Sequence, residues 1–194
     1  MRFRNYKIKN SMQNKIKMKW IMIFSFLSLL VTSTIVILIL DLSGYAGTMD
    51  DTQLGFNGDT IKAYFALMNS FQLNLFLLAN IIDYLFMISY GLFFFSSAKL
   101  LSWEYRRIPH VIGTAFAGMG ILAALCDATE NIFIITMTLN PTSFPSWLAI
   151  FHSSFATLKF LFMFLTIVWL LFSFLINKIP PISRMVVKPI PQTV

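Results

Sequence analysis

Cysteine and charge are both scarce in this chain of 194 residues, which has a single cysteine and only 12% charged residues. One thiol, Cys126, excludes an intrachain disulfide and any cysteine-rich zinc or C-x-x-C redox site. Soluble domains usually contain about 25% charged residues. The low charge, together with 57% apolar residues, therefore excludes an ordinary soluble domain and indicates an integral membrane protein.

Familiar catalytic motifs are absent as well. The sequence has no H-E-x-x-H, no G-x-S-x-G, no Walker A loop and no dinucleotide-binding G-x-G-x-x-G in a strand-helix context. His110 and His152 fall at opposite membrane surfaces in the expected topology, which excludes haem ligation by a histidine pair. We therefore expect no cofactor.

Four long apolar segments fill most of the chain. They cover about residues 20–40, 71–98, 111–138 and 147–176. Each is near or above the roughly 20 residues that a helix needs to cross about 30 Å of hydrocarbon. The first is longer than the roughly 7–15 residues of a signal-peptide core, so we expect it to remain as a span. The prediction is an all-α fold: one four-helix transmembrane bundle over residues 20–176.

Basic residues predict the orientation of the bundle. All lysines and arginines except Lys62 and Lys159 lie in the arm 1–19, the connection 99–107 or the Pro-rich tail 177–194. Because these residues stay on the cytoplasmic side, both termini are predicted to be cytoplasmic and the loop 41–70 external. We expect a multi-pass protein of the cell membrane, in a bacterium the inner membrane.

The net charge of +7 does not indicate a nucleic-acid partner, because it is dispersed over the cytoplasmic flanks with no binding module. The predicted partner is the lipid bilayer, whose anionic lipids attract basic flanking segments. The oligomeric state stays open.

The external loop is rich in glycine, with scattered aspartate and asparagine, which is typical of turns. After it, apolar residues recur at helical spacing: Ile61, Tyr64, Phe65, Met68 and Phe71. This pattern predicts a short amphipathic helix at the outer interface. It could be a simple connection or a lid over a site.

Four ionisable residues lie inside the predicted spans, namely Asp83, Asp127, Glu130 and Lys159. Each costs about 2.5–3.5 kcal/mol near the centre of a membrane helix, so they are expected to face the bundle interior. Each span presents its polar residues on one helical face: Asn80, Asp83 and Tyr90 on the second span, Asp127, Glu130 and Asn131 on the third, and His152 and Lys159 on the fourth. We predict that these residues converge on one polar cluster in the outer half of the bilayer.

Small residues on the third span share the face of its carboxyl groups. They are Gly113, Ala117, Gly120 and Ala124. Such spacing allows helices to approach closely, so the third span is predicted to be the central helix.

Several pairings remain open for the cluster. Lys159 could pair with Asp83 or Asp127 simply to fix helix register, and Glu130 is expected further out, with no fixed partner. His152 could be an interfacial residue. Asp83, Asp127, Glu130 and His152 could ligate a metal, but Lys159 at the same depth would repel it, so we expect no metal site.

Three short motifs resemble those of an uncharacterised family of small bacterial four-helix integral membrane proteins. In this chain they read Asp83-Tyr84-x-Phe86-x3-Tyr90-Gly91, Asp127-x2-Glu130-Asn131 and Thr157-x-Lys159, within about residues 54–170. The family pattern is D-x2-F-P-x2-Y-G, D-x2-E-N and T-x2-K, so Met87 stands at the usual proline and Thr157 is displaced by one position. The resemblance implies that the motif residues Asp83, Tyr90, Asp127, Glu130, Asn131 and Lys159 work as one set.

The buried cluster favours a protein that binds or moves a small or lipidic ligand or protons. Two alternatives stay open: a structural or assembly subunit in which the cluster fixes helix packing, and an intramembrane enzyme acting on lipid with a carboxylate as general base.

The orientation gives a first testable prediction. With Cys126 replaced, a cysteine at Asn57 should react with an impermeant thiol reagent in intact cells, whereas a cysteine at Asn5 should react only after the membrane is opened. Labelling at position 5 in intact cells would reverse the predicted topology.

Overall fold

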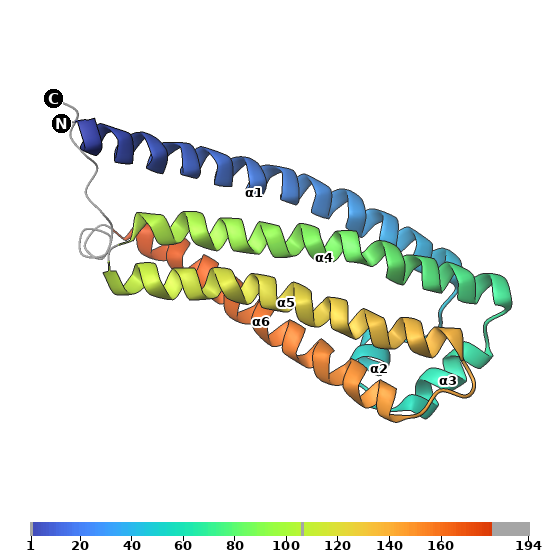
Figure 1. Ribbon diagram of the computed structural model, residues 1–194. Helices are drawn as coiled ribbons and strands as arrows, with labels where there is room; N and C mark the ends of the chain where they lie inside the picture. Colours follow the sequence, from blue (N-terminus) through green and yellow to red (C-terminus); the bar gives the residue numbers. More distant parts are fainter. Residues whose placement is uncertain (1, 106, 180–194) are drawn as a thin grey trace.

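The computed structural model describes residues 2–105 and 107–179 and contains six helices within them (Figure 1). They are α1 (Arg2–Ser43), α2 (Met49–Gln53), α3 (Gly58–Ala66), α4 (Ser70–Glu104), α5 (Arg107–Leu139) and α6 (Trp147–Lys178). The all-α prediction is confirmed. Most of the predicted Pro-rich tail, residues 180–194, lies outside the described residues.

Four of the helices are long and apolar enough to cross a membrane: α1, α4, α5 and α6. Each contains one of the apolar segments found in the sequence. They have 32 to 42 residues, and at a rise of about 1.5 Å per residue each is longer than the roughly 30 Å of hydrocarbon. Their ends therefore extend beyond the apolar layer.

The four long helices pack in chain order rather than as a closed ring. Among the described residues, α1 packs along α4, α4 along α5 and α5 along α6, whereas α1 and α6 share no such interface. The beginning of α1, the connection between α4 and α5 and the end of α6 lie at one end of the molecule, and α2 and α3 lie at the other (Figure 1). The segments rich in basic residues thus meet at one end.

Small residues bring α4 and α5 together, as the spacing of small residues in the segment 111–138 predicts. A Cβ added to Gly120 would lie 2.7 Å from the Cβ of Phe94, and one added to Gly91 would lie 2.8 Å from the Cβ of Ala124. Ala117 is completely buried. α4 and α5 can lie this close together only because glycine has no side chain at these two positions.

The short helices α2 and α3 form a cap on the bundle, at the end opposite to the basic segments (Figure 1). The side chains of Thr48 and Asn57 accept backbone N–H bonds at the first turns of α2 and α3. Ile61 and Phe65 of α3 are buried in the bundle core, where they pack with Phe76 and other apolar residues.

The predicted amphipathic helix is therefore shorter than its apolar pattern, and it faces the bundle core. α3 ends at Ala66, and Asn69 begins α4 through a capping box with Gln72. Met68 thus lies in the turn between the helices, and Phe71 belongs to α4, where it is exposed. The pattern continues across this turn because the cap in the sequence, Asn69-x-x-Gln72, interrupts the helix without interrupting the apolar spacing.

The close contact of α4 and α5 generates a stability prediction. Gly120→Ala should lower the free energy of unfolding by about 1–3 kcal/mol, because the new methyl group meets Phe94 and the backbone of Phe95. Gly118 lies on the same helix with nothing within 4 Å of an added Cβ, so Gly118→Ala should be neutral or slightly stabilising. Unfolding in mixed micelles measures both variants. Equal stability of the two would contradict the close packing.

Candidate functional site

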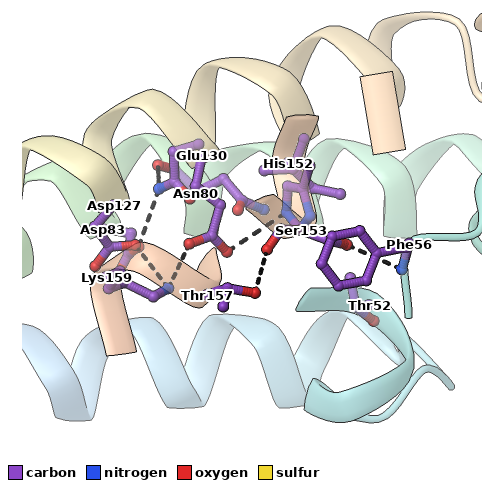
Figure 2. Close-up of polar contacts among 12 residues, drawn as sticks. Thr52, Phe56, Asn80, Asp83, Asp127, Glu130, His152, Ser153, Thr157 and Lys159 are labelled. Atoms are coloured by element: carbon purple, nitrogen blue, oxygen red, sulfur yellow. Dashed lines mark hydrogen bonds and ion pairs between the residues drawn. The ribbon is translucent and has the colours of Figure 1, made fainter. Parts of the chain in front are cut away.

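A buried ion-pair network lies between α5 and α6. The Nζ atom of Lys159 is 2.9 Å from Oδ1 of Asp127 and 2.5 Å from Oε2 of Glu130 (Figure 2). All three side chains are at most 6% exposed. One ammonium group thus serves two carboxylates, and the three groups compensate part of each other's desolvation cost.

The pairing differs from the sequence-based expectation in one respect. Glu130 was expected to lack a fixed partner because it lies one turn beyond Asp127, but the long Lys159 side chain reaches both carboxylates. Of the two partners expected for Lys159, Asp127 is confirmed. Asp83 does not lie within 4.0 Å of Lys159 or of any other described cationic side chain.

Tyr90 brings α4 into the network. Its hydroxyl donates to Oδ2 of Asp127 at 2.9 Å. On the same helix, the hydroxyl of Tyr84 donates to the backbone carbonyl of Ala128 at 3.1 Å. Asp127 therefore accepts a hydrogen bond from α4 and one from α6, which ties three helices together at this level.

His152 is a core residue, so the interfacial interpretation is wrong. It is 1% exposed, and its Nε2 lies 3.5 Å from Oε1 of Glu130. The cap covers this end of α6: the neighbouring Ser153 accepts a hydrogen bond from the backbone N–H of Phe56 at 3.1 Å (Figure 2). No pattern in the sequence predicts this covering, because Phe56 lies in a loop almost one hundred residues earlier.

Asp83 has a different environment from the other two carboxylates. Its Oδ2 accepts one hydrogen bond from Nδ2 of Asn131 at 3.0 Å, and the same amide donates to the backbone carbonyl of Asn80 at 3.1 Å. The Asn80 side chain donates to the carbonyl of Phe76 in its own helix. Asn131 thus holds the Asp83 side chain with a neutral amide and adds no positive charge.

A cavity of about 350 Å³ adjoins this part of the network. It is partly open to the surface and lies between α1 and α6, with α4 and α5 at its floor. Its polar lining includes Asp83, Tyr90, Asp127, Asn131 and Lys159. Its apolar lining includes Val36, Ile37, Leu40, Phe86, Phe160 and Met163. We call it the lateral cavity.

A second cavity of about 200 Å³ lies towards the cap. We call it the polar chamber. Its lining comes from the cap and from the helices below it, and includes Tyr45, Thr48, Thr52, Glu130, Ile134 and His152. Leu40, Gln53, Asn80 and Asn131 line both cavities, so these four side chains lie between them.

The cap is held over the chamber by its own hydrogen bonds. The hydroxyl of Tyr45 lies 3.0 Å from that of Thr52, and the hydroxyl of Tyr64 donates to Asp51 at 2.9 Å. Burial raises the pKa of Tyr45 to about 12, while hydrogen bonds from Thr48 and Tyr64 lower the pKa of the Asp51 carboxyl. Both shifts favour a neutral Tyr45 phenol and a charged Asp51 carboxylate, and the charged carboxylate is the acceptor that the Tyr64 hydroxyl needs.

The position that a metal ion would take between Asp127 and Glu130 is occupied by the ammonium group of Lys159. A divalent cation there would be repelled by this charge. The carboxylates are therefore arranged around an internal cation.

Comparison of the chain with protein-family models, curated proteins and solved structures finds no match. The resemblance of its three motifs to a family of bacterial membrane proteins remains a prediction.

Proposed function

We propose that this membrane protein binds an amphipathic cation, an amine with an apolar body, in the lateral cavity. The observation that carries the proposal is the carboxylate of Asp83, which lines the cavity with one amide donor and no described cationic partner within 4.0 Å. An ionised carboxylate at this depth needs a compensating positive charge.

The charge balance of the cluster supports a cationic ligand. Three carboxyl groups, Asp83, Asp127 and Glu130, face one ammonium group, and Lys159 contacts only the last two. His152 contacts Glu130 alone among these groups. A protonated amine beside Asp83 would supply the missing charge and form a charge-assisted hydrogen bond.

The walls of the cavity fit the rest of such a ligand. Valine, isoleucine, leucine, phenylalanine and methionine side chains from α1, α4 and α6 surround the polar floor, an arrangement typical of small-molecule sites. Because α1 and α6 are not packed along each other, a ligand dissolved in the bilayer can reach the floor from the side. Its alkyl chain would then replace lipid against these walls.

The purely structural alternative explains the Lys159 network but not Asp83. Asp127 and Glu130 are shared with an internal cation and need no ligand. Asp83 contributes to packing only through one amide bond, which an asparagine could also accept. The enzyme alternative requires a free general base next to a substrate atom, and Asp83 is the one carboxyl group of the cluster that could serve.

Orientation and location complete the proposal. The basic segments meet at one end of the molecule, and we place this end in the cytoplasm of a bacterial cell. The cap and the polar chamber then face outwards. The motif set expected from the family resemblance, Asp83 to Lys159, would form the ligand site.

Ligand binding predicts a difference between two otherwise similar probes. Dodecylamine should raise the midpoint of thermal unfolding of the protein in detergent, and dodecanol, with the same chain but no charge, should raise it much less. Asp83→Asn should weaken binding of the amine by at least about tenfold, since a hydrogen bond to a charged group contributes about 1.5–3 kcal/mol.

Asp41→Asn is the matched control for this variant. Asp41 is also an aspartate of a membrane helix, but it is exposed and does not line the cavity, so its replacement should leave the response to dodecylamine unchanged. Equal stabilisation of the wild type and Asp83→Asn by the amine would refute the proposed site.

A further inference from the structure

Two side chains that line the polar chamber have buried polar atoms that no described residue satisfies. Nδ1 of His152 and Oε1 of Gln53 are buried and have no hydrogen-bond partner among the described residues. Both side chains line the chamber, one from α6 and one from the cap. Buried polar atoms are nearly always hydrogen-bonded, so these two need a partner other than the described residues.

Water is the donor that fits. The chamber has about 200 Å³, and a water molecule takes about 30 Å³ in the liquid, so several can enter. The hydroxyls of Thr48 and Thr52 and the amide of Asn80 offer further partners around the same space. Although apolar side chains also line it, a cavity of this size with polar side chains on several sides can hold water.

We infer that the polar chamber is a water-filled proton port that leads from the cap side of the membrane to Glu130, with His152 as the residue that passes the proton. The His152 ring lines the chamber; its Nδ1 has no hydrogen-bond partner among the described residues, and its Nε2 lies 3.5 Å from Oε1 of Glu130. An imidazole with hydrogen on Nε2 can accept a proton on one side while it donates on the other.

The transfer balances in protons and charge. Hydronium in the chamber loses a proton to Nδ1 and becomes water. The imidazolium then loses its Nε2 proton to Oε1 of Glu130, which becomes a neutral carboxyl group. The ring is left with hydrogen on Nδ1. On release the steps run in reverse: Glu130 returns its proton to Nε2, and chamber water takes the proton on Nδ1, which restores the first tautomer.

Among the described residues, the charged groups around Glu130 lie on α4, α5 and α6. Lys159 on α6 contacts the second carboxyl oxygen of Glu130. Asp127, which lies on α5 like Glu130, shares this lysine. From α4 the nearest carboxyl is Asp83, on the side of the lateral cavity, and the cap contributes the neutral Tyr45. A proton on Glu130 therefore reduces the net negative charge of the whole cluster.

This inference deepens the proposed function by giving the site a regulator. An amine at Asp83 and a proton on Glu130 both compensate the same excess of negative charge. Each should weaken the binding of the other, and thermodynamic linkage makes the effect reciprocal. Affinity for the amine would fall as the pH falls. The experiment below uses no amine, so its failure would not be confused with failure of the ligand site.

Infrared spectroscopy of the protein in lipid nanodiscs tests the port. After a downward pH step, the carbonyl band of a protonated carboxyl group should rise in the wild type and be missing in Glu130→Gln. In His152→Gln, which keeps hydrogen bonding but not proton uptake, the band should reach the same height at least about tenfold more slowly. A purely structural histidine would give the same rate in both proteins.

Ser154→Ala is the matched control, because the Ser154 hydroxyl bonds within its own helix to the carbonyl of Ile150 and does not line the chamber. Its rate should equal that of the wild type. An unchanged rate in His152→Gln, or a pH-dependent band that survives in Glu130→Gln, would overturn the inference.

A cysteine-labelling experiment tests the port if His152→Gln does not fold. With Cys126 replaced by serine, a cysteine at Thr52 lines the chamber, whereas a cysteine at Leu54 next to it is exposed and does not. A small charged thiol reagent should label both positions and slow the infrared response only when attached at position 52. Failure to label position 52, or labelling there with no change in rate, would contradict a water-filled port.

Discussion

One ammonium group shared by two carboxylates holds this bundle together. Lys159 contacts Asp127 and Glu130 in a region where each isolated charge costs several kcal/mol. Removing the lysine would leave two carboxylates without a counterion, and breaking a buried pair in this way costs far more than the pair itself contributes. α5 and α6 must therefore face each other at this level, and the Tyr90 hydroxyl brings α4 to the same point.

The rest of the architecture follows from this arrangement. Glycines at the contact of α4 and α5 allow the backbones close enough for Tyr90 to reach Asp127. α1 contributes no charged residue to the cluster and packs on α4 alone among the long helices, so a cavity remains between α1 and α6. The cap closes one end of the space and divides it at Gln53 into an apolar-walled cavity and a polar chamber. Asp83, which has no described cationic partner within 4.0 Å, lines the first, and His152, whose Nδ1 has no described partner, lines the second.

The sequence predicted the helices and most members of the cluster, because the free-energy cost of placing a residue in the bilayer depends mainly on that residue and its own helix. Twenty apolar residues define a span, and any ionisable residue within one must turn inward, whatever its partner is. Which groups pair depends on how the helices are placed and how far each side chain extends between them. The sequence therefore could not show that Lys159 pairs with Glu130 rather than with Asp83. It also could not show that His152 is covered, since the cap that buries it folds back from residues 44–66. Nothing in the sequence indicated that Gln53 would lie between two cavities, because it stands among turn-forming residues of the external loop.

A double-mutant cycle on the shared lysine tests the account most directly. Lys159→Met should lower the free energy of unfolding by about 3–5 kcal/mol. Adding Asp127→Asn or Glu130→Gln should restore part of the loss, because each removes a carboxylate that the lysine neutralised. Asp83→Asn on the same background should restore much less, since Asp83 acts on the cluster only at long range and is not a partner within 4.0 Å. Recovery with Asp83→Asn alone, or additive losses in all three double variants, would contradict the shared ammonium group and the free carboxylate that follows from it.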